Sequence, residues 1–239
     1  MKKNYWMVLA VFFLLLNINI SNAAALKLMP IGDSITRGAV GAPTYRCFLW
    51  GMLAKSNLPQ FDFVGSMNTK VNQTEPGISG CPYQDFDVDH EGHEGWTTDR
   101  ILKQIGGWAS NHTPDVALIH LGTNDLSGGQ NAEGIIGEMD KIVDYLRTAK
   151  TGVVIFIAGV IPDTVHANID DKTREYNSRL STFCKEKSTA ESPIIFVDLY
   201  SKMDPSKDLF DGLHPTDSGN KKMANGWFQA LKAYYSKKK

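Results

Sequence analysis

A serine stands where an early apolar segment is expected to turn from a strand into a helix. The apolar residues 26–31 lead directly into Gly32, Asp33 and Ser34. A hydroxyl at a tight strand-to-helix junction shares its space with free backbone N–H groups, which is how many α/β hydrolases place their nucleophile. The G-x-S-x-G form of that junction is absent. A turn with a capping serine is the alternative interpretation of these residues alone.

An aspartate, Asp211, precedes His214 by three residues, shortly before the last expected helix. If the turn between them is tight, the carboxylate holds Nδ1 of the imidazole, and Nε2 is free to take a proton from a serine. A surface turn is the alternative interpretation of this pair alone. Asp198, at the end of the last expected strand, is a rival carboxylate, and we favour Asp211 as the partner of His214.

Two further residues could stabilise an oxygen that becomes negative during acyl transfer. Asn124 follows the third expected strand, where its side-chain amide can donate a hydrogen bond. Gly95 lies in a loop, and its missing side chain lets a backbone N–H approach the same oxygen. Each such donor typically contributes about 10²–10³ in turnover. The alternatives are an Asx-turn for Asn124 and loop flexibility for Gly95.

The elements that must position these residues are those of a parallel sheet. Apolar runs of strand length alternate with helix-period segments from residue 26 onward, which is typical of βαβ units. We expect strands at residues 26–31, 61–65, 116–120, 153–159 and 194–197, and helices at residues 45–55, 98–110, 132–149, 172–187 and 216–235. This predicts an α/β fold with three αβα layers and a five-stranded parallel sheet, in which ligands bind beyond the carboxyl ends of the strands.

The composition is that of one ordinary globular domain. The 239 residues suit a single core, and the hydrophobic share of 42% and charged share of 21% argue against disorder. A formal net charge of -1 gives no indication of nucleic acid as a partner. The long irregular segment 66–94 is rich in Gly, Pro, Asp and Asn, and loops of this length tend to be functional. We expect a monomer.

The first 25 residues differ from the rest. A positive start at Lys2 and Lys3 precedes an apolar run and then small residues up to Ala23, which is the pattern of a secretory signal peptide. The run is too short for a convincing membrane span, and an uncleaved anchor is the alternative. We predict a signal peptide over residues 1–25, a hydrolase domain over residues 26–239, secretion, and no stable association with a membrane.

Three cysteines, Cys47, Cys81 and Cys184, allow one internal bridge and leave one thiol free. Cys47 and Cys184 fall in expected helices, and Cys81 falls in a Gly/Pro-rich loop. We interpret the two helical cysteines as buried free thiols and assign no disulfide.

The chain contains, in this order, a serine, a glycine, an asparagine and an Asp-x-x-His segment. This is the order found in the SGNH (GDSL) hydrolases, and the sequence resembles that family over nearly all of its length after the N-terminal segment. The resemblance implies a flavodoxin-like fold with Ser34 as nucleophile. It implies an oxyanion hole formed by the N–H groups of Ser34 and Gly95 and the side chain of Asn124. His214 is then the base and later the acid, and Asp211 orients it.

A narrower resemblance concerns residues 29–36, 45–46, 62–66 and 90–98, which are similar to carbohydrate esterase family 3, a group made up mainly of acetylxylan esterases. It implies the removal of O-acetyl groups from plant cell-wall polysaccharide such as acetylated xylan, with an acetylated polysaccharide or oligosaccharide as the partner. Trp96 is a candidate wall for a sugar ring, with core packing as its alternative.

This route needs no metal or other cofactor. Some relatives carry a structural calcium, and Asp85, Asp87 and Asp89 suggest one here. We favour a solvated acidic loop as the interpretation of these three residues.

Two alternative functions remain at this stage. A lipase, lysophospholipase or thioesterase would use the same machinery on an acyl chain, but it needs a long apolar groove, whereas the segment 66–94 is largely polar. A non-catalytic carbohydrate-binding protein would keep the fold without turnover, but binding alone requires no serine, histidine and aspartate in this order.

Overall fold

The computed structural model of the protein describes residues 24–38, 42–67 and 80–238. The predicted signal peptide falls on residues 1–25, of which 1–23 lie outside the described residues, so it stays a prediction. Among the helices of the described part of the chain, none combines the length and the apolar character that crossing a bilayer requires.

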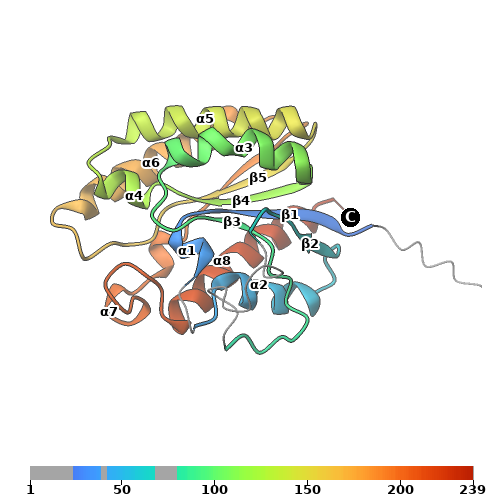
Figure 1. The fold of residues 1–239 in the computed structure, drawn as a ribbon, viewed down its shortest axis with the longest axis horizontal. Coiled ribbons are helices and arrows are strands. Elements are labelled where there is room, and N and C mark those ends of the chain that lie inside the picture. The colour runs from blue at the N-terminus through green and yellow to red at the C-terminus, as the bar shows by residue number, and fades with distance from the viewer. Residues whose placement is uncertain (1–23, 39–41, 68–79, 239) are drawn as a thin grey trace, which may run out of the picture.

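A parallel sheet of six strands runs through the centre of the molecule (Figure 1). Its order is β2 (Phe61–Phe63), β1 (Leu26–Gly32), β4 (Val116–His120), β5 (Val154–Ala158) and β6 (Ile194–Val197), and β3 (Glu91–Gly92) pairs with the end of β1. Without β3 this is the strand order of flavodoxin-like sheets. The predicted fold class is confirmed. The sixth strand was expected to be loop, because two residues are too few to show a strand periodicity.

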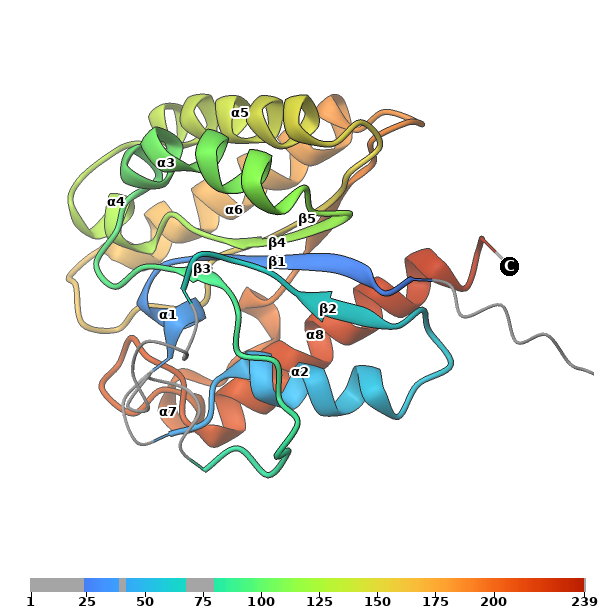
Figure 2. The same cartoon turned by 45° about the vertical axis from the view of Figure 1, so that its right-hand side comes forward.

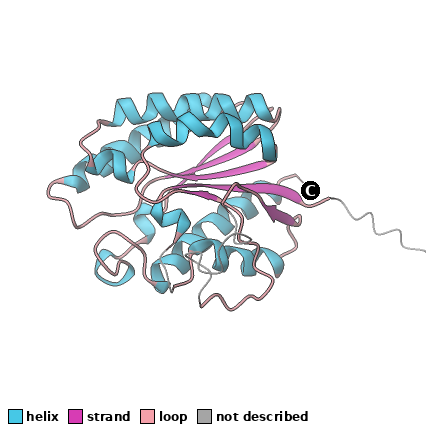
Figure 3. Ribbon diagram, in the orientation of Figure 1, coloured by secondary structure: helices cyan, strands magenta, loops and turns pink. Residues whose placement is uncertain are grey.

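Helices cover both faces of the sheet, which gives the three layers (Figures 1, 2 and 3). One face carries α3 (Thr98–His112), α5 (Ala132–Ala149) and α6 (Ile169–Lys187), and the other carries α2 (Tyr45–Ala54) and α8 (Asp217–Tyr235). The short helices are α1 (Ser34–Arg37), α4 (Thr123–Ser127), α7 (Pro205–Asp208) and the 3₁₀ turn η1 (Tyr200–Lys202). Three of the short elements follow directly after strands of the sheet, so they stand at its carboxyl edge.

Each layer of helices has an apolar stripe that faces the sheet. In α5 the residues Ile135, Met139, Ile142 and Leu146 recur every three or four positions, and all are fully buried. This spacing puts them on one side of a helix with 3.6 residues per turn. The strands between the layers are buried on both faces, which explains why they read as continuous apolar runs.

A disulfide joins Cys47 in α2 to Cys81 in the loop before β3. The interpretation of Cys47 as a free thiol is therefore wrong, while Cys184 is free and buried as expected. The spacing of the two cysteines along the chain carries no signal for the pairing, because the bond depends on a loop that folds back onto α2. The bridge anchors the end of that loop to the helix.

The order in which strands are added to the sheet reverses at β1. The chain adds β2 on one side of β1 and later adds β4 on the other side. In open α/β sheets the ligand site lies beyond the carboxyl ends of the strands at this switch point. Ser34 follows β1 and Asn124 follows β4, so both candidate residues stand there.

Candidate active site

Ser34, His214 and Asp211 form one continuous hydrogen-bonded chain. The Oγ atom of Ser34 lies 2.9 Å from Nε2 of His214, and Nδ1 of the same imidazole lies 2.7 Å from Oδ2 of Asp211. The other carboxylate oxygen accepts the backbone N–H groups of Leu213 at 3.0 Å and of His214 at 2.7 Å. Residues from the first and last thirds of the chain thus meet in the order that a nucleophile, a base and an orienting acid require.

The environment of Asp211 favours its ionised form. Partial burial opposes ionisation, but the hydrogen bonds from the backbone and side chain of His214 and from the N–H of Leu213 outweigh it and lower the pKa of Asp211. The ionised carboxylate fixes the tautomer with the proton on Nδ1, so Nε2 accepts from Ser34. The rival carboxylate, Asp198, instead accepts hydrogen bonds from the backbone and hydroxyl of Ser201.

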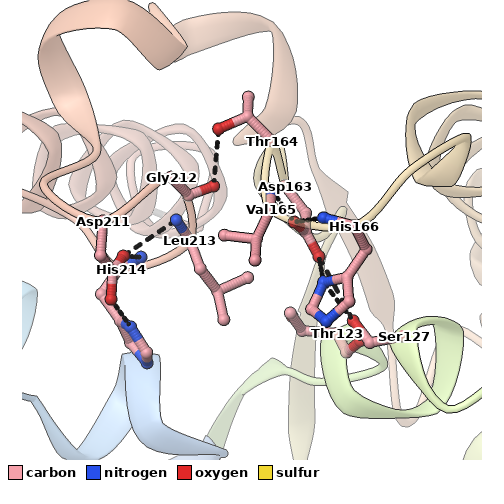
Figure 4. A network of polar contacts seen from close by, with 10 residues as sticks. All are labelled: Thr123, Ser127, Asp163, Thr164, Val165, His166, Asp211, Gly212, Leu213 and His214. Carbon is pink, nitrogen blue, oxygen red and sulfur yellow. Dashed lines mark hydrogen bonds and ion pairs between the residues drawn. The ribbon is translucent and has the colours of Figure 1, made fainter.

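Figure 4 shows the hydrogen bonds within the turn that carries Asp211 and His214, and further contacts close this turn at its two ends. The N–H of Phe210 donates to the carbonyl of His214 at 3.0 Å, and Leu209 forms a bridge with Pro215. Within the turn Gly212 has a φ of +85°, and a Cβ atom there would lie 2.6 Å from the hydroxyl of Thr164. Only glycine suits this position, because both the backbone angle and the close approach exclude a side chain.

The helix that begins at Ser34 is held at both ends. Asp33 caps it, since its Oδ1 accepts the N–H of Ile35 at 2.9 Å. At the other end the buried guanidinium of Arg46 donates to the carbonyl oxygens of Thr36 at 2.9 Å and Arg37 at 3.0 Å. The backbone on both sides of the Ser34 hydroxyl is therefore fixed.

The Asp33 carboxyl group is fully buried, and its Oδ2 accepts no hydrogen bond from the residues that the structure describes. Burial is the main cause that raises its pKa to about 6, and the hydrogen bond from Ile35 and the proximity of His214 oppose that rise. An acid with this pKa near the imidazole of His214 is a feature that the sequence does not reveal, because Asp33 looks like an ordinary helix cap.

Strand register brings the three predicted oxyanion donors to one place. Gly32 of β1 pairs with Gly92 of β3 on one side and with His120 of β4 on the other. Ser34 lies two positions after Gly32, Gly95 lies three positions after Gly92, and Asn124 lies four positions after His120. All three therefore leave the sheet at the same level of its carboxyl edge.

Each of the three donors has a group that can turn toward an oxyanion. The N–H of Ser34 is in the first turn of α1, where helix N–H groups have no partner within the helix. Gly95 is exposed and has a φ of +70°. The amide of Asn124 donates one hydrogen to the carbonyl of Trp96 at 3.0 Å, which ties α4 to the Gly95 turn and leaves a second hydrogen on the same nitrogen.

An aromatic stack supports the Gly95 turn. The imidazole of His93 lies against the ring of Trp96, with centroids 4.4 Å apart and 23° between the planes, and against Trp108 on α3. Its Nε2 lies 3.0 Å from the fully buried carboxylate of Glu91. Trp96 is half-buried in this stack, and its role as a wall for a sugar ring stays a prediction.

An exposed aromatic residue beside the imidazole of His214 was not identified from the sequence. The ring of Phe210 is 57% exposed and stacks on the ring of His214, with centroids 5.8 Å apart and 23° between the planes. Both residues line a small hollow with Ser34, together with Ile35, Gly38, Ala42, Pro43, Pro215 and Asn220. The signal that could have revealed Phe210 is an aromatic residue directly before the Asp-x-x-His segment.

The acidic residues suggested as a calcium site are not gathered around a common point. Asp87 accepts the backbone N–H groups of Phe63 at 2.8 Å and Asp89 at 3.3 Å, and Asp85 is exposed. In the described ranges of the chain, no group of three or more His, Cys, Asp or Glu side chains is arranged to hold a metal ion.

Comparison with known proteins places this site in a family. Residues 31–222 match the model of the GDSL-like Lipase/Acylhydrolase family. The chain is 28% identical over 231 residues to a multidomain esterase of Ruminococcus flavefaciens; these residues are 90% of the chain but only 29% of the length of that esterase. The curated relative is thus much longer than the chain.

Two solved structures are similar over most of their length. A carbohydrate esterase family 3 protein from Talaromyces cellulolyticus has a TM-score of 0.75 and 31% identity, covering 89% of this chain and 99% of that one. The Clostridium thermocellum family 3 carbohydrate esterase has a TM-score of 0.70 and 32% identity, covering 89% and 100%. The resemblance seen in the sequence is confirmed. The chain belongs to the GDSL-like lipase/acylhydrolase family of carboxylic ester hydrolases, and it is of the carbohydrate esterase family 3 type.

Proposed function

We propose that the protein removes O-acetyl groups from plant cell-wall polysaccharide such as acetylated xylan, through an acyl-enzyme on Ser34. The observation that carries the proposal is the hydrogen-bonded chain from Ser34 through His214 to Asp211 at the switch point of the sheet. The likeness to two carbohydrate esterases of family 3 supports the choice of an acetylated carbohydrate as substrate.

The reaction follows from the positions of the protons. His214 takes the hydroxyl proton at Nε2 as Ser34 Oγ attacks the acetyl carbonyl carbon, and the imidazolium is stabilised by Asp211. The negative oxygen accepts hydrogen bonds from Ser34, Gly95 and Asn124. The tetrahedral intermediate expels the sugar oxygen, which receives the proton from His214 and leaves as a hydroxyl. Water then loses a proton to His214 and attacks the acetyl-serine, which releases acetate and restores the Ser34 hydroxyl.

The surroundings of Ser34 favour a short acyl group. The hollow beside Ser34 and His214 has a volume of about 10 Å³, which is space for a group of the size of one water molecule. A lipid acyl chain needs a long apolar groove, and this hollow is not one. The exposed ring of Phe210 offers a flat apolar surface of the kind on which sugar rings pack.

We also propose that the protein acts outside the cell. The positive and then apolar start of the sequence supports export. The Cys47–Cys81 disulfide supports the same conclusion, because such bonds persist in oxidising compartments. Expression of the full chain, followed by N-terminal sequencing of the protein in the medium, tests this. A new N-terminus close to Ala23 or Ala25 is expected, and retention of the whole chain in the cells would contradict export.

The activity is tested by acetate release from acetylated xylan, measured beside a series of p-nitrophenyl esters of increasing chain length. Wild type is compared with Ser34→Ala. We expect acetate from xylan and a steep preference for the two-carbon ester, with turnover reduced by about 10⁴-fold or more in the variant. Activity that rises with chain length while xylan is left intact would retain the catalytic chain but move the substrate to a lipid or thioester. Full acetate release by Ser34→Ala would refute the mechanism.

A further inference from the structure

The catalytic Asp-x-x-His arrangement occurs a second time in the molecule, in the loop after β5 (Figure 4). Oδ1 of Asp163 accepts the N–H groups of Val165 at 2.8 Å and of His166 at 3.2 Å, and its Oδ2 lies 2.7 Å from Nδ1 of His166. Asp211 makes the same contacts with Leu213 and His214. The second imidazole is therefore oriented by the same means as the catalytic one.

The second pair differs from the first in what reaches its imidazole. The hydroxyl of Ser127 lies 3.2 Å from Oδ2 of Asp163 and 3.4 Å from Nδ1 of His166, on the side of the acid. Its single hydrogen is shared between that carboxylate and the carbonyl of Thr123 at 3.0 Å. Nε2 of His166 has no hydrogen-bond partner among the residues that the structure describes. Among the described residues no hydroxyl lies at Nε2 of His166. The Asp163–His166 pair therefore has no nucleophile there, and it suits binding rather than hydrolysis.

The burial of the two partners is unequal. The side chain of Asp163 is 3% exposed, whereas that of His166 is 44% exposed. A buried carboxylate that accepts two backbone N–H groups and lies beside the Ser127 hydroxyl thus serves to hold an imidazole that faces solvent. With the proton kept on Nδ1, Nε2 presents a lone pair to whatever approaches, and the group that matches it is a hydroxyl.

The loop that carries His166 is attached to the catalytic turn. The backbone N–H and the hydroxyl of Thr164 both donate to the carbonyl of Gly212, at 2.8 Å and 3.1 Å. The side chain of Val165, which is 56% exposed, also lies close to Gly212. In Figure 4 the side chains of Val165 and Leu213 occupy the space between the two Asp–His pairs. Ser127 belongs to α4, the helix that carries Asn124, so the loop contacts elements that bear both the base and an oxyanion donor.

We propose that His166, held by Asp163 and Ser127, forms a carbohydrate-binding subsite that accepts a hydrogen bond from a hydroxyl of a sugar residue next to the acetylated one. This proposal rests on the proposed function, since it requires a carbohydrate substrate that extends beyond the reacting ester. The exposed methyl groups of Val165 give that sugar an apolar surface on the way from His214 to His166. The subsite distinguishes a polymer from a small ester, because a small ester does not reach it.

The test compares acetylated xylo-oligosaccharides with p-nitrophenyl acetate as substrates of the wild type, His166→Ala and His166→Gln. One lost hydrogen bond between neutral groups predicts a rise of about three- to tenfold in KM for the oligosaccharide in His166→Ala, with kcat unchanged. Partial restoration is expected in His166→Gln, because its side-chain oxygen is also an acceptor. His112→Ala, which removes a half-buried histidine at the opposite end of the sheet, is the matched control and should behave like wild type.

The p-nitrophenyl acetate kinetics separate the outcomes. Unchanged hydrolysis of this ester by His166→Ala shows that the variant is folded and that its catalytic chain is intact. An unchanged KM for the oligosaccharide would overturn the subsite, and so would an equal loss on both substrates, which indicates a purely structural role for the loop. If the wild type hydrolyses p-nitrophenyl acetate but releases no acetate from the oligosaccharide, the proposed function fails and the subsite fails with it.

Discussion

The imidazole of His93 lies almost parallel to the indole of Trp108, with ring centroids 4.5 Å apart and 4° between the planes. The ring of Trp96 also packs on the imidazole of His93, with centroids 4.4 Å apart, and the carboxylate of Glu91 lies at hydrogen-bond distance from Nε2 of this imidazole. His93 and Trp96 flank Gly95 in the chain, and the N–H of Trp96 donates to the carbonyl of His93 at 3.1 Å. The stack thereby connects the core of the α3 layer to a backbone group that is proposed to stabilise the oxyanion.

Replacement of His93 by alanine should therefore affect stability and turnover together. The variant leaves a cavity between two indoles and a buried carboxylate with one partner fewer, so we expect the free energy of unfolding to fall by about 2–4 kcal/mol. We expect kcat for p-nitrophenyl acetate to fall by about 10²-fold, because the Gly95 turn is displaced. Urea unfolding and steady-state kinetics at a temperature where the variant is folded measure both. A normal kcat in a folded His93→Ala would separate the stack from catalysis.

Gly95 and Gly129 form a matched pair for testing the oxyanion donor. Both have a positive φ, 70° and 90°, and a Cβ atom at either one would meet nothing within 4 Å. Alanine at each position should thus cost about 1–2 kcal/mol of stability through backbone strain alone. Only Gly95→Ala is expected to lower kcat, by about 10-fold to 10²-fold, with KM retained. Equal activity of the two variants would contradict the expectation that strain at the Gly95 turn displaces its donor N–H.

The buried Asp33 makes a testable contribution to pH-dependent stability. Its pKa of about 6 lies above the ordinary value of 3.8, so between these values the folded state holds a proton that the unfolded state has released. Stability is therefore lost as the pH rises through this window, and the loss is complete above the folded pKa. Two pKa units correspond to about 3 kcal/mol.

Asp33→Asn removes this charge and keeps a helix cap. We expect the variant to be more stable than wild type at pH 8, by up to about 3 kcal/mol, and the difference to vanish near pH 3. Urea titrations at both pH values, with the exposed Asp62→Asn as control, provide the measurement. A stability difference that is independent of pH would show that the effect of the substitution does not come from the carboxyl ionisation.

The disulfide between Cys47 and Cys81 closes a loop with a sequence separation of 34. Cross-linking a loop of this length stabilises the folded state by about 4 kcal/mol in the chain-entropy model. A reductant, or the double variant Cys47→Ala/Cys81→Ala, should lower the free energy of unfolding by an amount of this order. Cys184→Ala keeps the bridge and should still respond to the reductant. If Cys184→Ala no longer responds to the reductant, Cys184 takes part in the bond and the pairing of Cys47 with Cys81 is wrong.

The regular elements and the hydrogen-bonded chain from Ser34 to Asp211 could be predicted from the sequence, because each has a local signal. Strands such as β4 and helices such as α5 begin and end at the predicted residues, since continuous apolar runs and a 3.6-residue period mark them. Ser34 was identified because it directly follows a strand, and Asp211 and His214 because they lie shortly before the last helix. Their contact, predicted from the carboxyl edge of a parallel sheet, is present in the structure.

What the sequence did not reveal depends on contacts between distant segments. β3 exists because Gly92 reaches the end of β1, and the pairing of Cys47 depends on a loop that returns to α2. Asp163 and His166 show the Asp-x-x-His spacing, but their meaning comes from Ser127 and from the attachment of Thr164 to Gly212. Long-range contacts of this kind leave no periodicity in the chain.

The closed turn that holds Asp211 and His214 has a mechanical consequence. Its internal hydrogen bonds make the acid and the base a single unit, which is attached to the rest of the fold through Thr164 and Asn220. The rest of the fold then sets the distance between His214 and Ser34. Asn220 spans the two sides, because it donates to Pro215 at 3.2 Å and accepts from Tyr45 at 2.9 Å. Because Arg46 of α2 also holds the end of α1, a motion of the first turn of α8 relative to α2 is expected to change the distance from Ser34 to His214.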